Sequence, residues 1–313
     1  MSATRTKLDA TTPVSPESNA RIHFRNILFA TDYSASADAA LAYATGLAVS
    51  FGATLHTMHV QEPVNYALPV ETWQAEEAAC EARLQRLTDT VRRDHPSIDA
   101  QSIKGEGIVW AAIEDAVRRL NVDLVVIGTR GRTGVAKFLL GSQAEQIVRN
   151  VSCPVLTVGP QVTSLQRRQG RMRSMVFATD FGPASLAACR YAVSLAEEYD
   201  AQLTLLHVIA VPESDAPEKS GESAAMCKKV LEQMFPASAK PWCEPVFLVD
   251  YGKAAEKILE LAEKQSADLI VLGVHAAEGL PGAAHHLARA TVHQVVSRAQ
   301  CAVLTVPDNR RCS

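Results

Sequence analysis

Several motifs of nucleotide-dependent and metal-dependent proteins are missing from this 313-residue sequence. It has no GxxxxGK[ST] loop, which argues against a P-loop NTPase. Its seven cysteines include no CxxC pair, so we expect free thiols in a reducing, cytoplasmic compartment. The formal net charge is only -3, which gives no general attraction to nucleic acid or to an anionic membrane.

Residues of the common catalytic arrangements are missing as well. There is no Ser, His and Asp in a hydrolase order, no paired acid and base, and no identifiable residue that would orient an attacking water. His285, His286 and His293 lack the carboxylate or thiolate that would complete a set of metal ligands. We therefore predict neither a dedicated enzyme nor a dedicated metal site.

The start of the chain lacks the apolar run of a secretory signal. Residues 1–22 are rich in Ser, Thr, Ala and Pro, and we expect them to form a disordered tail. The stretch between Asp38 and Glu62 carries no Asp, Glu, Lys or Arg, but the related stretch later in the chain contains Arg190 and Asp200. A membrane helix is therefore not predicted.

What the sequence does contain is an internal repeat. NILFATD at 26–32 recurs as SMVFATD at 174–180, and CPVLTV at 153–158 recurs as CAVLTV at 301–306, each 148 positions later. This period is too long for a solenoid and indicates a duplicated domain. We predict the first domain over 23–159, a linker over 160–173 and the second domain over 174–308.

Each half alternates short apolar runs with longer segments of helical periodicity, which predicts a parallel sheet covered by helices on both faces. The strands are expected at 25–31, 54–60, 98–104, 123–128, 154–158, 175–179, 202–208, 245–249, 268–273 and 302–306.

A glycine-rich loop follows the fourth expected strand. Gly128, Gly131, Gly141 and Ser142 have the spacing Gly-x2-Gly-x9-Gly-Ser, and a helix-like segment follows. Glycines let backbone N–H groups approach an anion, and a helix N-terminus adds unpaired donors and a positive dipole end. We predict a phosphate cradle in which Arg130 neutralises charge. The alternative is that Ser142, three residues before Glu145, only caps the helix.

This spacing resembles the ATP-binding signature of the universal stress protein family, and the repeat is typical of a tandem two-domain member. The resemblance implies an α/β fold of two open parallel sheets, Rossmann-like and adenine nucleotide alpha hydrolase-like, each with strand order 3-2-1-4-5. It also implies that adenine lies against the backbone of Val60 and that Asp32 sits beside the adenosine.

The same strand order brings the two motifs together. Ligands of open parallel sheets bind at the carboxyl ends of the strands where the order reverses, here between strands one and four. Those strands end in Thr31-Asp32 and in Gly128. We therefore expect one crevice lined by Thr31, Asp32, Val60, Gly128, Arg130, Gly131, Gly141 and Ser142.

The second copy keeps only part of this set. Thr179, Asp180, Val208 and Gly273 match the first copy, whereas Gly141 and Ser142 correspond approximately to Arg289 and Ala290. Gly131 corresponds to Ala276. Our hypothesis is that only the first domain binds ATP well.

The resemblance implies a cytoplasmic ATP-binding protein of the stress response, which signals through nucleotide-dependent conformation or binding of an unidentified protein partner. Magnesium would arrive with ATP, and slow ATP hydrolysis is the most we expect. The alternatives are a scaffold with vestigial pockets and an enzyme of the adenine nucleotide alpha hydrolase type. The apolar edge strands ending at Val158 and Val306 are expected to pair as an intramolecular pseudo-dimer, and further homodimerisation is left open.

Overall fold

The computed structural model describes residues 21–61, 70–129, 140–160, 162, 172–210, 220–236, 239, 244–274 and 283–308. Strands and helices alternate in both halves of the chain. The elements of the first half are β1 (Asn26–Ala30), α1 (Ala35–Phe51), β2 (Thr54–Gln61), α2 (Val70–Asp94), β3 (Ala100–Glu106), α3 (Val109–Leu120), β4 (Leu124–Gly128), α4 (Ser142–Asn150) and β5 (Val155–Val158).

The second half repeats this order with similar lengths. Its elements are β6 (Ser174–Thr179), α6 (Pro183–Tyr199), β7 (Gln202–Ile209), α7 (Ser220–Met234), β8 (Val246–Tyr251), α8 (Ala254–Lys264), β9 (Leu269–Val274), α9 (Ala283–Arg298) and β10 (Ala302–Pro307). Residues 1–20 of the predicted tail and most of the predicted linker lie outside the described residues.

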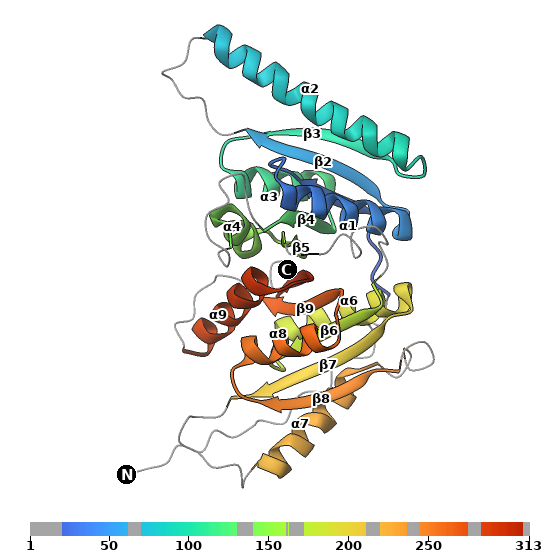
Figure 1. Cartoon of the computed structure of the whole chain (residues 1–313), viewed down its shortest axis with the longest axis vertical. Helices are drawn as coiled ribbons and strands as arrows, with labels where there is room; N and C mark the ends of the chain where they lie inside the picture. The colour runs from blue at the N-terminus through green and yellow to red at the C-terminus, as the bar shows by residue number, and fades with distance from the viewer. Residues whose placement is uncertain are drawn as a thin grey trace.

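The strands of the described residues form one sheet with the order β3-β2-β1-β4-β5-β10-β9-β6-β7-β8 (Figure 1). Each half therefore has the order 3-2-1-4-5 that the family resemblance implied. All strand pairs within a half are parallel. The chain thus builds two open α/β units that share a single continuous sheet.

The two halves meet through an antiparallel pair, β5 with β10. Leu156 faces Leu304, and Thr157 faces Val303. The hydroxyl of Thr157 donates to the carbonyl of Val303 at 3.1 Å, and that of Thr305 donates to the carbonyl of Val155, also at 3.1 Å. The expected intramolecular pairing of these edge strands is present and has approximate two-fold symmetry.

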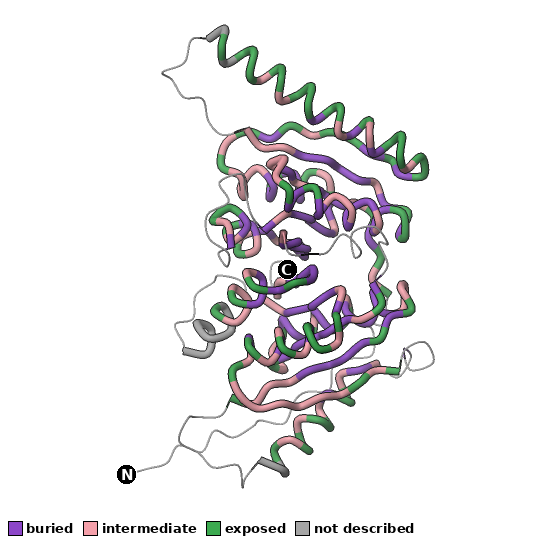
Figure 2. Tube along the Cα trace, in the orientation of Figure 1, coloured by how far each residue is buried: buried purple, intermediate pink, exposed green. Residues whose placement is uncertain are grey.

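Two apolar clusters cover the two faces of the sheet. Because side chains alternate along a strand, Ile27 and Phe29 of β1 join the cluster beneath α1 and α6, whereas Leu28 joins the cluster beneath α3, α4, α8 and α9. Both clusters continue across the β5–β10 junction. Figure 2 shows the buried segments concentrated along the strands and the inner sides of the helices.

An aspartate anchors the start of the first strand in each half. Asp123 Oδ2 accepts hydrogen bonds from the amides of Arg25 at 2.7 Å and Asn26 at 2.9 Å. Asp268 Oδ2 accepts equivalent bonds from the amides at 173 and 174, at 2.7 and 3.1 Å. These bonds give a physical reason for the recurrence of aspartate ahead of β4 and β9.

We expect Asp123→Ala to lower the free energy of unfolding by about 2–3 kcal/mol, because two charge-assisted hydrogen bonds are lost. Urea denaturation of the full chain measures this change. The control is Asp115→Ala, which removes an exposed i,i+4 pair with Arg119 and should cost less than about 0.5 kcal/mol. Equal losses in the two variants would contradict the anchoring role of Asp123.

Candidate functional site

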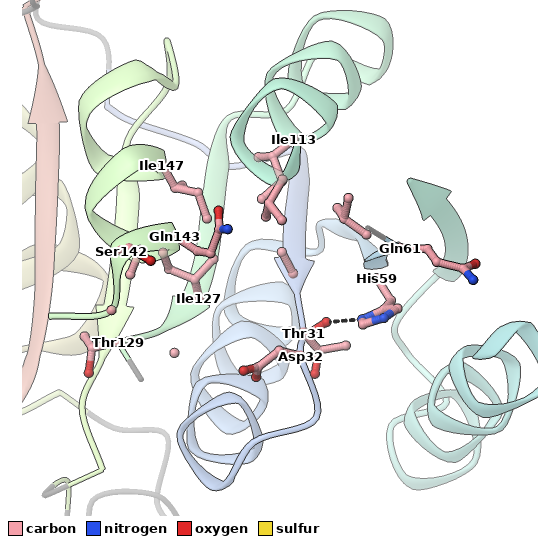
Figure 3. Close-up of a pocket in the computed structure, with 16 residues that line it drawn as sticks. Thr31, Asp32, His59, Gln61, Ile113, Ile127, Thr129, Ser142, Gln143 and Ile147 are labelled. Carbon is pink, nitrogen blue, oxygen red and sulfur yellow. Dashed lines mark hydrogen bonds between the residues drawn. The ribbon is translucent and has the colours of Figure 1, made fainter. Parts of the chain in front are cut away.

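A cavity of about 520 Å³ opens at the carboxyl ends of β1, β2 and β4, where the strand order reverses (Figure 3). Six of the eight residues chosen from the sequence line it, namely Thr31, Asp32, Val60, Gly128, Gly141 and Ser142. Arg130 and Gly131 lie outside the described residues. The structure therefore brings together the two motifs that the sequence placed far apart.

Helix α4 begins at this cavity without a side-chain cap. Its N-cap is Gly141, with φ −61° and ψ 141°, so the N-cap residue offers no side chain to accept from the amides of the first turn. The amide of Gly141 donates to the carbonyl of Thr129 at 2.9 Å, which fixes the approach of the chain. The capping alternative for Ser142 is wrong, because Ser142 is the first helical residue. The first amides of α4 remain available to an anion.

The loop after β1 holds Asp32 at the opposite side of the cavity. The hydroxyl of Thr31 accepts from the amide of Tyr33 at 2.9 Å, and Asp32 Oδ1 accepts from the amide of Ser34 at 3.0 Å. Ser34 in turn caps α1, accepting from the amide of Ala37 at 3.3 Å. Asp32 therefore stabilises its own loop and also lines the cavity.

A stack of side chains that the sequence analysis did not consider supports this wall. His59 lines the cavity, and its Nδ1 donates to the carbonyl of Thr31 at 2.6 Å. The ring of Tyr33 lies 4.8 Å from the His59 ring, with the guanidinium carbon of Arg83 3.9 Å above Tyr33. Such cation–π contacts hold rings in place. The sequence did carry a signal, because Phe181 and His207 repeat the ring pair.

Gly128 has a packing role that differs from the role inferred from the sequence. A Cβ at this position would lie 2.7 Å from the amide nitrogen of Ala37 and 2.8 Å from the carbonyl carbon of Ser36. Glycine is therefore needed for the close approach of α1 to β4, independently of any ligand. Gly273 packs against α6 in the same way, because a Cβ added there would lie 2.4 Å from the carbonyl carbon of Ala184. This explains why the glycine persists in the second copy.

The corresponding cavity in the second half has a volume of only about 120 Å³. Thr179, Asp180, Val208 and Gly273 line it, as their positions in the repeat suggested. Asp180 Oδ1 already accepts from the hydroxyl of Ser185 at 2.6 Å and from the amide of Gly182 at 2.9 Å. The first half has Ala37 in place of Ser185, so it has no such hydroxyl.

The second half also lacks a helix start at its cavity. Ser142, the first residue of α4, corresponds to Ala290, and α9 begins well before it, at Ala283. The amide of Ala290 therefore belongs to a helix interior, where hydrogen bonds within the helix use such amides. The two cavities differ in their backbone as well as in their side chains.

The described residues offer no group of three or more His, Cys, Asp or Glu that could hold a metal ion. Nε2 of His293 lies 4.0 Å from Oε2 of Glu145. His285 and His286 are not among the side chains that the structure describes. Burial raises the pKa of the Cys189 and Cys301 thiols to about 12, so both are protonated at neutral pH. Among the helices of the described residues, none is both long and apolar enough to cross a membrane.

The protein is a tandem α/β protein. Its two open units are joined edge to edge, and a cavity large enough for a small ligand lies where the strand order of the first unit reverses. The chain belongs to the universal stress protein family, whose model matches residues 23–159 and 172–307. Both halves of the repeat are thus family domains.

Individual relatives agree with this assignment. The chain is 34% identical to universal stress protein A homolog 1 of Coxiella burnetii over 145 residues, which cover 44% of this chain and 97% of that protein. It is 25% identical to a universal stress protein of Mycolicibacterium smegmatis over 269 residues, covering 82% and 89%. The structure of a universal stress protein from Archaeoglobus fulgidus shares the fold, with a TM-score of 0.67, 18% identity and coverage of 91% and 97%.

Proposed function

We propose that the first half of the chain binds ATP and that the second half does not. The supporting observation is that one cavity has the uncapped start of α4 on one side and the Asp32 carboxylate on the other. Its volume lies within the range of about 300–1,000 Å³ that is typical of small-molecule sites. The second cavity, at about 120 Å³, lies below this range.

The residues present fit the parts of the nucleotide. The amides of Ser142 and Gln143, the first two residues of α4, would hold phosphate oxygens at the positive end of the helix. Asp32 would accept hydrogen bonds from the polar edge of the adenosine, and Val60 would contribute its backbone to the base. The apolar side chains between these ends suit a purine ring, namely Val109, Ile113, Ile127, Ala144 and Ile147.

Signalling, rather than turnover, is the function that this site supports. Asp32 and His59 both line the cavity, but Asp32 accepts from the amide of Ser34 and His59 donates to the carbonyl of Thr31. They are therefore not arranged as an acid–base pair, and held phosphates would hydrolyse slowly at most. Helix α4 also approaches the second half, because Glu145 Oε2 lies 4.0 Å from Nε2 of His293 in α9. Nucleotide bound at the start of α4 would therefore favour one conformation of the chain, and a protein partner in the cytoplasm would recognise that conformation during stress.

We expect equilibrium titration of the full chain with Mg·ATP to give one tight site per chain. At free ATP of about 100 times the Kd, binding should stabilise the fold by roughly 2.7 kcal/mol, which thermal denaturation detects. A scaffold with vestigial pockets would show no shift at millimolar Mg·ATP. Two equivalent sites would contradict the proposed difference between the halves.

Matched aspartate variants locate the site. Asp32→Ala removes an acceptor beside the adenosine and should raise the Kd for ATP about tenfold. Asp180→Ala changes the equivalent residue of the second half and should leave the Kd unchanged, even though it removes internal hydrogen bonds. Equal effects of the two substitutions would reject the assignment to the first half.

A further inference from the structure

We propose that Gln143 reads the base of the bound nucleotide, by pairing its side-chain amide with the N6 and N7 edge of adenine. This inference rests on the function proposed above and assigns a specificity residue to the same site. It goes beyond the glycine loop and the Asp32 loop, which would recognise phosphate and adenosine without contacting this edge of the base.

Gln143 is the second residue of α4 and lines the cavity. Side chains on a helix lean toward its N-terminus, which here is the end that faces the cavity. Figure 3 shows the amide of Gln143 projecting between Ile113 of α3 and Ile147 of α4. It therefore lies on the apolar side of the cavity, where a purine ring would fit.

The amide of Gln143 is available for a ligand. Gln143 is exposed and makes no hydrogen bond to any residue that the structure describes, so a ligand would replace only water as the partner of its amide. Apolar residues line the cavity beside it. Gln61 is the other lining residue with a side-chain amide, and Figure 3 shows that amide pointing away from the cavity. Among the described lining residues, Gln143 alone thus presents a side-chain amide to this apolar region.

The chemistry of a primary amide selects adenine at this edge. The amide offers one donor and one acceptor side by side, which match the N7 acceptor and the N6–H donor of adenine in a bidentate pair. Guanine presents two acceptors there, N7 and O6. The NH2 group of Gln143 could still donate to one of them, but the amide oxygen would face the other acceptor. Val60, on the β2 side, would then contribute its backbone to a different edge of the base.

The second half provides an internal comparison. Gln143 corresponds to Thr291, which lines the smaller cavity. A threonine hydroxyl is too short and too small to form the bidentate pair. The half that lacks the helix start at its cavity therefore also lacks the base-reading amide.

The experiment measures Kd values of ATP, 7-deaza-ATP and GTP for the full chain and for two variants, Gln143→Ala and Gln146→Ala. Gln146 is the matched control, because it is also an exposed glutamine of α4 but is not among the residues that line the cavity. We expect Gln143→Ala to raise the Kd for ATP about tenfold and to lower the preference for ATP over GTP by a similar factor. Gln146→Ala should leave both unchanged.

The ligand lacking N7 tests the contact itself. The unmodified chain should bind 7-deaza-ATP about fivefold more weakly than ATP, whereas Gln143→Ala should bind the two equally. Tight binding of ATP that Gln143→Ala does not alter would overturn this inference and leave the proposed function intact. A persistent difference between ATP and 7-deaza-ATP in Gln143→Ala would also overturn it. Absence of ATP binding by the unmodified chain would overturn both.

Discussion

Gly128→Ala is expected to lower the free energy of unfolding by about 3 kcal/mol, with ATP absent. The added Cβ would lie 2.7 Å from the amide nitrogen of Ala37 and 2.8 Å from the carbonyl carbon of Ser36. These are backbone atoms at the start of α1, so no side-chain rotation relieves the contact. Overpacking of a well-packed core costs about 1–3 kcal/mol, and a rigid backbone neighbour places this substitution at the upper end.

Urea denaturation of matched glycine variants measures the effect. Gly273→Ala should cost at least as much, because its Cβ would lie 2.4 Å from Ala184. Gly159→Ala is the control, since its nearest neighbour would be 3.6 Å away, and it should cost less than about 1 kcal/mol. If Gly128→Ala proves as mild as Gly159→Ala, the glycine is not required for packing and a role in ligand approach becomes its main explanation.

Leu156→Ala should be comparably destabilising, by about 3 kcal/mol. Leu156 and Leu304 are both almost fully buried and face each other in the antiparallel pair that joins the halves. Truncating a buried leucine to alanine removes contacts and leaves a cavity, which costs about 2–5 kcal/mol. Because the strands pair with approximate two-fold symmetry, Leu304→Ala is expected to cost a similar amount.

Chemical denaturation of the two single variants and of the double variant checks this prediction. Residues opposite each other on paired strands interact, so the double variant should depart from the sum of the single effects. Val49→Ala, an exposed site on α1, should change stability by less than about 0.5 kcal/mol. Loss of stability at only one of the two leucines would contradict the symmetric packing of the junction.

The fold was accessible from the sequence because its strands are nearly continuous apolar runs. NILFA at 26–30 and LVVIG at 124–128 are neighbouring interior strands of the sheet, each with a strand on both sides. The pairing of β5 with β10 was also predictable, because CPVLTV and CAVLTV are apolar edges that require a neighbour. Local pattern and family resemblance agree at these positions.

The site was only partly predictable, because its decisive features depend on contacts between distant segments. The sequence suggested a ligand role for Gly128, whereas its nearest neighbours belong to α1, far back along the chain. The hydrogen bond from Ser185 to Asp180 could not be inferred from a repeat in which the aspartate itself is retained. The early start of α9 was hidden as well, since comparing residues one by one does not show where a helix begins.

The antiparallel β5–β10 pair has a consequence for behaviour on dilution. When two separate chains meet through such an edge, their association depends on protein concentration. Here both partners belong to one polypeptide, so closure of the junction is unimolecular and is set by an effective concentration that the connecting segment fixes. The two different domains therefore remain in a fixed one-to-one ratio, and neither half has to compete with other chains for its neighbour.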